Sequence, residues 1–273
     1  MNWFHDKIDS RGVTLLSSFL MVASLFVAGC QPVQTRAEES NQVLKDIRDT
    51  TVIPDLGSYD AAIQRKSLDR IMLSIDKAPG ITLNLLVATL EDSLIDSRTK
   101  RVICTILAQE GDLRALPALS RMLAEGSVAE DDLLESALVQ LGEKSVKPVA
   151  RILAEGNVTA RRNAASILLA LDVPYALDSL QDRFQIEKDA EVRFLCVCGL
   201  AADARAESVS ILAHALEDID LEVRRAAWGG LARKVRPPQS IRFDPEASSS
   251  QRAFQARLVR DWLSGSEKKG AAL

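Results

Sequence analysis

The chain has 273 residues, of which 47% are hydrophobic, so it carries enough apolar material for a packed core and is not a disordered polypeptide. Aromatic residues make up only 4%, and the apolar content is mainly Leu, Ala, Val and Ile, which favours packed helices over aromatic-rich strands. The formal net charge of −4 disfavours nucleic acid as a partner, because phosphate recognition needs a concentrated basic surface. The chain has 2 histidines, too few for most metal and acid–base sites, and we expect neither a metal nor another cofactor.

The first 29 residues have the organisation of a secretory signal peptide. Lys7 and Arg11 precede an apolar run from Val13 to Ala28, and small residues end the run. The run is shorter than the ~20 residues that a membrane-spanning helix requires. We therefore expect residues 1–29 to be removed on export, which leaves His214 as the one histidine of the mature chain.

The four residues Val27, Ala28, Gly29 and Cys30 resemble the lipobox of bacterial lipoproteins. In that family the cysteine sulfur is diacylated and the signal is cut just before the cysteine, so the resemblance implies membrane anchoring through Cys30. Gln31 stands where an aspartate would resemble an inner-membrane retention signal. This favours the periplasmic face of the outer membrane in a Gram-negative source, and otherwise the outer face of the cytoplasmic membrane. The alternative is an ordinary signal peptide, or a short uncleaved anchor, in which Cys30 has no role.

The remainder divides by composition into four segments. Residues 30–57 are polar and contain Pro32 and Pro54, which predicts a membrane-proximal tether. Residues 58–236 carry internal repeats, residues 237–263 follow as a capping segment, and residues 264–273 are expected to be a flexible tail.

The repeats have a period of 30 to 32 residues. Val192-Arg193 recurs as Val223-Arg224 after 31 residues, and the six residues from Arg121 recur with one substitution from Arg151. A period of this length, built from two helical stretches, is typical of a solenoid. The expected units are 59–93, 94–126, 127–156, 157–188, 189–219 and 220–236.

One unit shows the expected helical hairpin. Apolar residues at helical spacing predict a first helix over 158–171, and Pro174 suits the first turn of a second helix over 174–185. Asn157, Asp189 and Asp220 are predicted N-caps, and Ser127 with Glu130 has the spacing of a capping box.

Three segments resemble bacterial HEAT-like repeats of the short, phycobilisome-lyase type. The segment from Gly111 to Leu119 is similar to their inter-helix turn, and Asp189 to Arg193 and Asp220 to Arg224 are similar to their first-helix openings. The resemblance implies an all-α fold: a right-handed α-solenoid of about five to six short helical hairpins with a C-terminal capping helix. The third unit departs from the pattern, since Asp131 replaces the arginine. Tetratricopeptide repeats have a similar period, but their Trp, Gly, Tyr and Phe positions are missing here.

The capping segment begins after Pro237-Pro238, which ends the last repeat helix. Ser248 and Gln251 have capping-box spacing, and Phe254, Leu258 and Trp262 follow at i, i+4 and i+8. This pattern predicts an amphipathic helix whose apolar row covers the open end of the stack.

The side chains with chemical potential are few. Cys104, Cys196 and Cys198 are interpreted as small apolar packing residues rather than a metal or redox site. Cys196 and Cys198 stand two residues apart on one predicted helix, so they cannot form a disulfide with each other. Arg161, Arg193 and Arg224 should stand in register, where they either brace the repeats or form a ladder for an anionic ligand. We expect His214 on the surface and Trp228 in the core.

No nucleophile elbow, Walker A motif or dinucleotide fingerprint occurs in the sequence. We therefore expect a non-catalytic scaffold or adaptor of the cell envelope that holds a protein or peptide on its concave face and binds no nucleic acid. The alternative, implied by the resemblance, is a phycobilin-lyase-like enzyme or another HEAT-like accessory factor that acts on a partner protein.

Overall fold

A computed structural model describes residues 38, 41–43, 45–47, 51–126 and 132–270, with side chains described as far as residue 265. The chain divides into two units, Met1–Gln42 and Val43–Leu273, and the helices from α2 onward all belong to the second. The predicted signal peptide, the lipobox with Cys30, the capping box of Ser127 and Glu130, and Asp131 lie outside the described residues. Within the described ranges, no helix has both the length and the apolar character needed to cross a membrane.

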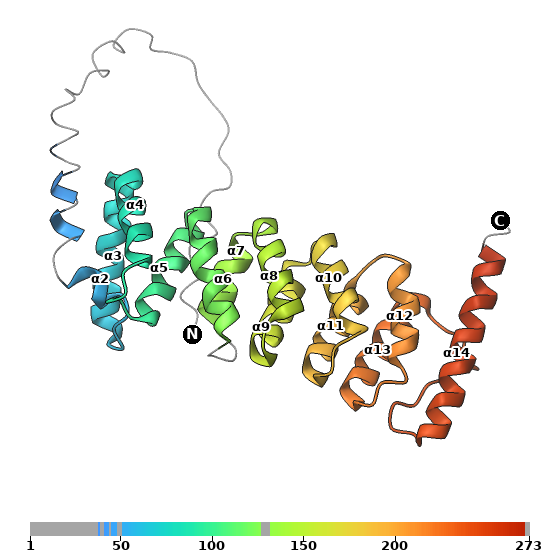
Figure 1. Ribbon diagram of the computed structural model, residues 1–273. Helices are drawn as coiled ribbons and strands as arrows, with labels where there is room; N and C mark the ends of the chain where they lie inside the picture. Colours follow the sequence, from blue (N-terminus) through green and yellow to red (C-terminus); the bar gives the residue numbers. More distant parts are fainter. Residues whose placement is uncertain (1–37, 39–40, 44, 48–50, 127–131, 271–273) are drawn as a thin grey trace, which may run out of the picture. The chain divides into compact units, whose positions relative to one another are not determined.

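Regular structure in these ranges is entirely helical (Figure 1). The helices are α2 (Val52–Asp55), α3 (Ala61–Lys77), α4 (Pro79–Leu90), α5 (Ser97–Gln109), the 3-10 turn η1 (Leu113–Ala115), α6 (Leu116–Glu125), α7 (Asp132–Gln140), α8 (Glu143–Glu155), α9 (Val158–Leu171), α10 (Pro174–Phe184), α11 (Ala190–Ala202), α12 (Glu207–Ala215), α13 (Leu221–Val235) and α14 (Ser249–Gly270).

From α3 to α12 the helices follow one another as hairpins stacked in chain order (Figure 1). The first helices contact one another from unit to unit, as α5 does α7, α9 does α11 and α11 does α13. The second helix of one unit packs against the first helix of the next, as α8 does α9 and α10 does α11. The predicted all-α solenoid is confirmed.

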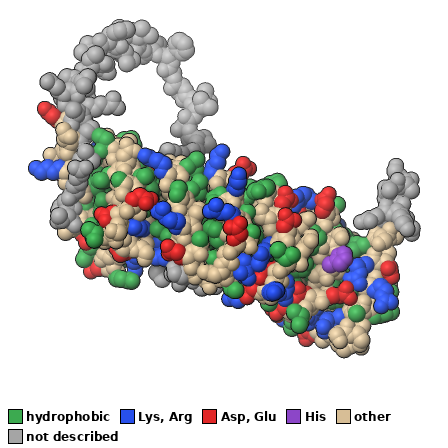
Figure 2. Space-filling view, in the orientation of Figure 1, with side chains coloured by type: hydrophobic (Ala, Val, Ile, Leu, Met, Phe, Trp, Pro, Cys, Tyr) green, Lys and Arg blue, Asp and Glu red, His purple; other side chains and the backbone are tan. Residues whose placement is uncertain are grey.

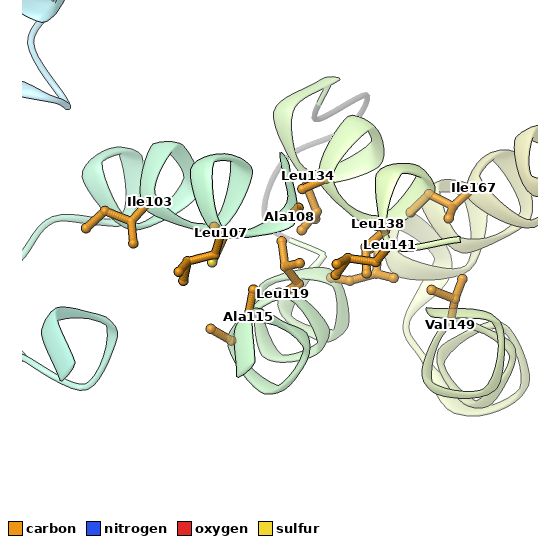
Figure 3. Close-up of a cluster of buried hydrophobic side chains, with 14 of the residues drawn as sticks. Ile103, Leu107, Ala108, Ala115, Leu119, Leu134, Leu138, Leu141, Val149 and Ile167 are labelled. Carbon is orange, nitrogen blue, oxygen red and sulfur yellow. The ribbon is translucent and has the colours of Figure 1, made fainter. Parts of the chain in front are cut away.

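The core runs along the stack as two clusters of buried side chains that divide within α11, one from Val43 to Cys196 and the other from Val197 to Val259. Figure 3 shows side chains from successive units directed toward one another, including Ile103 and Leu107 of α5, Leu119 of α6, Leu138 of α7 and Ile167 of α9, and all five are buried. Each helical hairpin has an apolar stripe that only its neighbours cover. Folding of one unit therefore depends on the units beside it.

The helix starts follow the predicted caps. Asn157, Asp189 and Asp220 each accept hydrogen bonds from backbone N–H groups of the helix that they precede, which confirms all three N-caps. The helix predicted over 158–171 is α9, and the one predicted over 174–185 is α10. Asp60 and Asp96 cap α3 and α5 in the same way.

The folded unit begins earlier than the composition indicated. Val43, Ile47, Val52 and Leu56 lie in the segment expected to be a tether, and all four are buried in the core cluster. They belong to the same cluster as Ile71 and Ile75 of α3, and α2 contacts α3. The hydroxyl of Ser67 on α3 donates to the carbonyl of Val52 and fixes this segment. These four positions of the predicted tether, residues 30–57, therefore belong to the folded unit.

The C-terminal helix also differs from the prediction. Its capping box is present, since the Ser248 N–H donates to Gln251 Oε1 at 3.2 Å and the Gln251 N–H donates to Ser248 Oγ at 3.4 Å. However, α14 continues to Gly270, so residues 264–270 are helical rather than a loose tail.

The face of α14 that packs on the stack is not the predicted one. Ala256 and Val259 are fully buried against the core, whereas Phe254 and Leu258 are exposed. Arg260 pairs with Glu217, two residues beyond the end of α12, at 2.6 Å. Small side chains on the packed face let α14 approach α12 closely, which the larger residues would prevent.

Candidate functional site

The predicted arginines occupy equivalent places at the starts of α9, α11 and α13. Arg161, Arg193 and Arg224 each stand four residues after the N-cap, one helical turn along. From there Nη1 reaches back to the carbonyl just before the N-cap. These donor–acceptor distances are 3.0 Å to Gly156, 2.7 Å to Lys188 and 2.8 Å to Ile219.

Two of the arginines also form paired hydrogen bonds with a carboxylate of the following turn. Nε and Nη2 of Arg161 donate to the two oxygens of Glu187, both at 2.9 Å. The same atoms of Arg193 donate to the two oxygens of Asp218, both at 2.8 Å. Each acid stands two residues before the next N-cap, so every such pair ties one unit to the next.

Arg224 occupies the same position without a carboxylate. Its Nε donates to the carbonyl of Pro245 at 2.9 Å. Burial lowers the pKa of Arg224, and the neighbouring charge of Arg252 lowers it further. These contacts support the bracing interpretation for all three arginines, because their guanidinium groups donate to groups of the chain itself.

Sequence reasoning missed a fourth member of this series. Arg252 stands four residues after Ser248, and its Nη1 donates to the carbonyl of Ala247 at 2.6 Å. The sequence contained a signal for this position, because Arg252 follows the capping residue Ser248 at the same four-residue spacing as the other three arginines follow their N-caps. The start of α14 therefore repeats the start of a first helix.

Glu187 is the most completely enclosed acid of the series, with a side chain that is 0% exposed. Arg183 donates to it at 2.6 Å in addition to Arg161, and the backbone N–H groups of Lys188 and Asp189 donate at 2.8 Å. Burial raises the pKa of Glu187, but these hydrogen bonds outweigh burial and the pKa falls to about 2. The carboxylate is thus ionised throughout the physiological range.

The turns that lead into the first helices carry a row of exposed apolar side chains. The turns before α9, α11 and α13 lie along one edge of the stack, since Arg161 and Arg193 each join one of these turns to the next. We call the row the turn-edge row, and each member lies within three residues of an N-cap. The exposed fractions are 89% for Tyr59, 89% for Leu94, 43% for Val158, 69% for Ile186 and 89% for Ile219.

The caps explain why these side chains point outward. The turns before α9, α11 and α13 are closed by a capping side chain and by an arginine that donates to a carbonyl of the turn, and Asp60 and Asp96 cap the helices that follow Tyr59 and Leu94. Arg98 lies over the ring of Tyr59, with its guanidinium carbon 4.0 Å from the ring centroid. No periodic signal marked the row in the sequence, because its members stand at different offsets from the caps.

The exposed side chains of the second helices differ in type from those of the turn-edge row. They are mainly small, polar or charged, for example Ala88, Arg121, Lys147, Asp182 and Ser210, and Tyr175 at the start of α10, which is 57% exposed, is the exception. His214 on α12 is exposed, as predicted, and its Nδ1 lies 2.7 Å from the carbonyl oxygen of Ser210. Figure 2 shows basic and acidic side chains intermixed over the visible face rather than gathered by sign.

The three cysteines in the described residues are packing residues. Cys104 and Cys196 are buried, and burial raises the pKa of each thiol to about 12. Cys198 is partly buried and unpaired, and burial raises its pKa as well. Trp228 packs on the core with its ring centroid 5.9 Å from that of Phe243. In the described ranges no three His, Cys, Asp or Glu side chains cluster as they would to hold a metal ion.

Helix packing defines this part of the chain as an all-α helical-repeat solenoid. No family model matches the chain, and no curated protein matches it. Among solved structures the chain is similar to a designed armadillo repeat protein, with 15% identity and a TM-score of 0.35. That similarity covers 67% of this chain and 98% of the designed one.

Proposed function

We propose that this protein is a lipid-anchored, HEAT-like repeat scaffold of the cell envelope that binds a protein partner along its turn edge and performs no catalysis. The observation that supports the proposal best is the turn-edge row. Exposed apolar residues on a protein surface are usually scattered. Here Tyr59, Leu94, Val158, Ile186 and Ile219 each lie at or beside a turn that leads into a first helix, and the turn before α7 lies outside the described residues.

The spacing of the row suits an extended polypeptide. Packed helices lie about 8–10 Å apart, and an extended chain advances about 3.3 Å per residue. An extended partner would therefore meet one unit with every third residue. The charges beside the row have both signs, as with Lys188, Glu191 and Arg225, which favours a polypeptide over an anionic lipid surface.

Photo-crosslinking in the native envelope tests the partner surface. A photoreactive amino acid placed at Leu94, Ile186 or Ile219 should give adducts of one shared mass, because a single extended partner would cross several units. Matched substitutions at Arg151 and Ser210, which are exposed on second helices, should give none. Equal yields at both sets, or different masses from each edge position, would contradict the proposal.

Metabolic labelling with an alkyne fatty acid tests the anchor. The wild-type chain should take up label on export, and the Cys30→Ala variant should lose both the label and membrane association, because the acyl chains supply the membrane affinity. The Cys198→Ala variant is the control and should keep the label. Label that persists after Cys30→Ala would overturn this part of the proposal.

A further inference from the structure

The arginine at the start of α14 differs from its equivalents in one respect. In Arg161 and Arg193, Nη1 donates to the carbonyl before the N-cap, while Nε and Nη2 donate together to one carboxylate. Arg252 makes the first contact, to the carbonyl of Ala247 at 2.6 Å. Its Nε and Nη2 form no hydrogen bond or ion pair with the part of the chain that the structure describes, and neither nitrogen is enclosed. We call these two nitrogens the open edge of Arg252.

The pattern of the series explains why none of the described acids reaches the open edge. Glu187 and Asp218 each stand in a turn two residues before the next N-cap. For Arg252 the corresponding turn would follow α14, and the described residues end within that helix. Glu246 has the equivalent position in the turn before α14, but it pairs with Arg225. The open edge therefore matches a carboxylate position for which the described chain supplies no acid.

Two guanidinium groups of the series influence each other here. Arg224 is only 6% exposed, and its Nε donates to the carbonyl of Pro245 instead of to a carboxylate. Burial lowers the pKa of Arg224, the charge of Arg252 lowers it further, and Asp220 and Asp218 only partly offset these effects. An anion at the open edge would balance the two positive charges. The parallel N–H groups of Nε and Nη2 fit the two oxygens of a carboxylate.

The carboxylates inside the chain indicate how such a group is presented. Asp218 accepts the backbone N–H of Asp220 at 2.8 Å, and Glu187 accepts those of Lys188 and Asp189 at the same distance. Each acid thus orders its own turn and binds an arginine at the same time. A polypeptide turn with an acid two residues before a helix start makes both kinds of contact, whereas a small free anion makes only one.

We propose that the open edge of Arg252 binds an acidic side chain of a partner polypeptide, carried in a turn like those that follow α10 and α12. The carboxylate accepts from Nε and Nη2, as Asp218 does from Arg193. The partner thereby continues the series of ion pairs beyond the start of α14. The site includes no residue of the turn-edge row, so it does not depend on the proposed function.

A nuclear magnetic resonance titration of the full chain tests the site. The probe is a peptide that copies residues 215–222 of this chain, which include Asp218, with both ends blocked. The Nε–H signal of Arg252, identified by its loss in the Arg252→Lys variant, should shift and saturate as the peptide is added. The Nε–H signal of Arg193 should not move, because this group already donates to a carboxylate.

Matched changes in the peptide and in the protein test the contact, with affinity measured by fluorescence anisotropy of the labelled peptide. Asparagine in place of the peptide's copy of Asp218 should weaken binding about tenfold, as expected for the loss of charge-assisted hydrogen bonds. This change leaves the protein intact. Arg252→Lys should also weaken binding, since lysine keeps the charge but not the paired geometry. Arg257→Lys, at an exposed position of the same helix, should leave the affinity unchanged.

Four outcomes contradict the proposal. The Arg252 signal fails to shift, or the asparagine peptide binds as tightly as the original. Arg257→Lys weakens binding as much as Arg252→Lys, which would mean a general charge effect. A peptide with a free carboxyl terminus and no acidic side chain binds more tightly, which would assign the open edge to a chain end. Inorganic phosphate shifts the signal at lower concentration than the peptide does, which would assign it to phosphate. None of these outcomes affects the turn-edge crosslinks.

Discussion

Replacing Glu187 with alanine should destabilise the folded chain by about 3–5 kcal/mol, the range expected when one partner of a buried ion pair is removed. The change would leave Arg161 and Arg183, whose side chains are 14% and 13% exposed, without their shared carboxylate. It would also remove the acceptor for the backbone N–H groups of Lys188 and Asp189. Urea unfolding followed by far-ultraviolet circular dichroism measures the effect.

Glu191→Ala is the matched control for this experiment. Glu191 pairs with Arg162 at 2.7 Å, but its side chain is 51% exposed. Exposed pairs contribute about 0.2–1 kcal/mol, so this variant should lose far less stability. Equal losses for Glu187→Ala and Glu191→Ala would show that the buried position of Glu187 has no special role.

Glu187 should also make the stability of the folded chain depend on pH, in the range between about pH 4.5 and pH 2. The pKa of Glu187 is about 2 in the folded chain against an ordinary value of 4.5. The lowered value means that its contribution is complete above about pH 4.5 and is lost as the pH falls toward 2, and a shift of this size corresponds to about 3 kcal/mol. In the Glu187→Gln variant the acid-induced loss over this window should be smaller by that amount.

Gly230→Ala should destabilise the chain by about 1–3 kcal/mol, as expected for overpacking in a tight core. A Cβ atom at Gly230 would overlap the Cβ atom of Ala201 on α11 and would lie 3.1 Å from its Cα atom. Because the obstacle includes backbone, α11 and α13 would have to move apart. Thermal unfolding of the variant would show the loss as a lower Tm.

Gly229→Ala is the control on the adjacent residue and should have the opposite sign. A Cβ atom there would meet only Arg233 Nη1, at 3.5 Å, and Gly229 lies within α13. Alanine in a helix interior is favoured over glycine by about 0.5–1 kcal/mol, so Tm should rise. A loss of stability for both variants would mean that the close approach of α11 and α13 is not the cause.

Sequence periodicity predicted the repeats because the same local rules act in every unit. A capping residue such as Asp189 and an arginine four residues later satisfy the backbone of one helix end, and this pair recurs at the starts of α9, α11 and α13. The carboxylate partners were harder to predict. Glu187 and Asp218 lie in turns of the following unit, and only the packed structure brings them to Arg161 and Arg193.

The two ends of the stack were predicted less well, for a common reason. At an end, a helix has a neighbour on one side only, so its own apolar pattern does not determine which face is buried. In α14 the large residues Phe254 and Leu258 gave the stronger pattern, but the smaller Ala256 and Val259 fit against α12. Near the start of the chain, polar composition concealed Val43 and Ile47, which are buried in the core.

The burial of Val43 sets how far the repeats can lie from a membrane that holds Cys30. Only residues 31–42 separate the proposed lipid anchor from the first buried side chain. Even at full extension this length spans about 45 Å. A partner anchored in the same membrane would therefore share a thin layer with the scaffold. Their effective concentration would greatly exceed that of a freely diffusing pair, and a weak contact would suffice to hold them together.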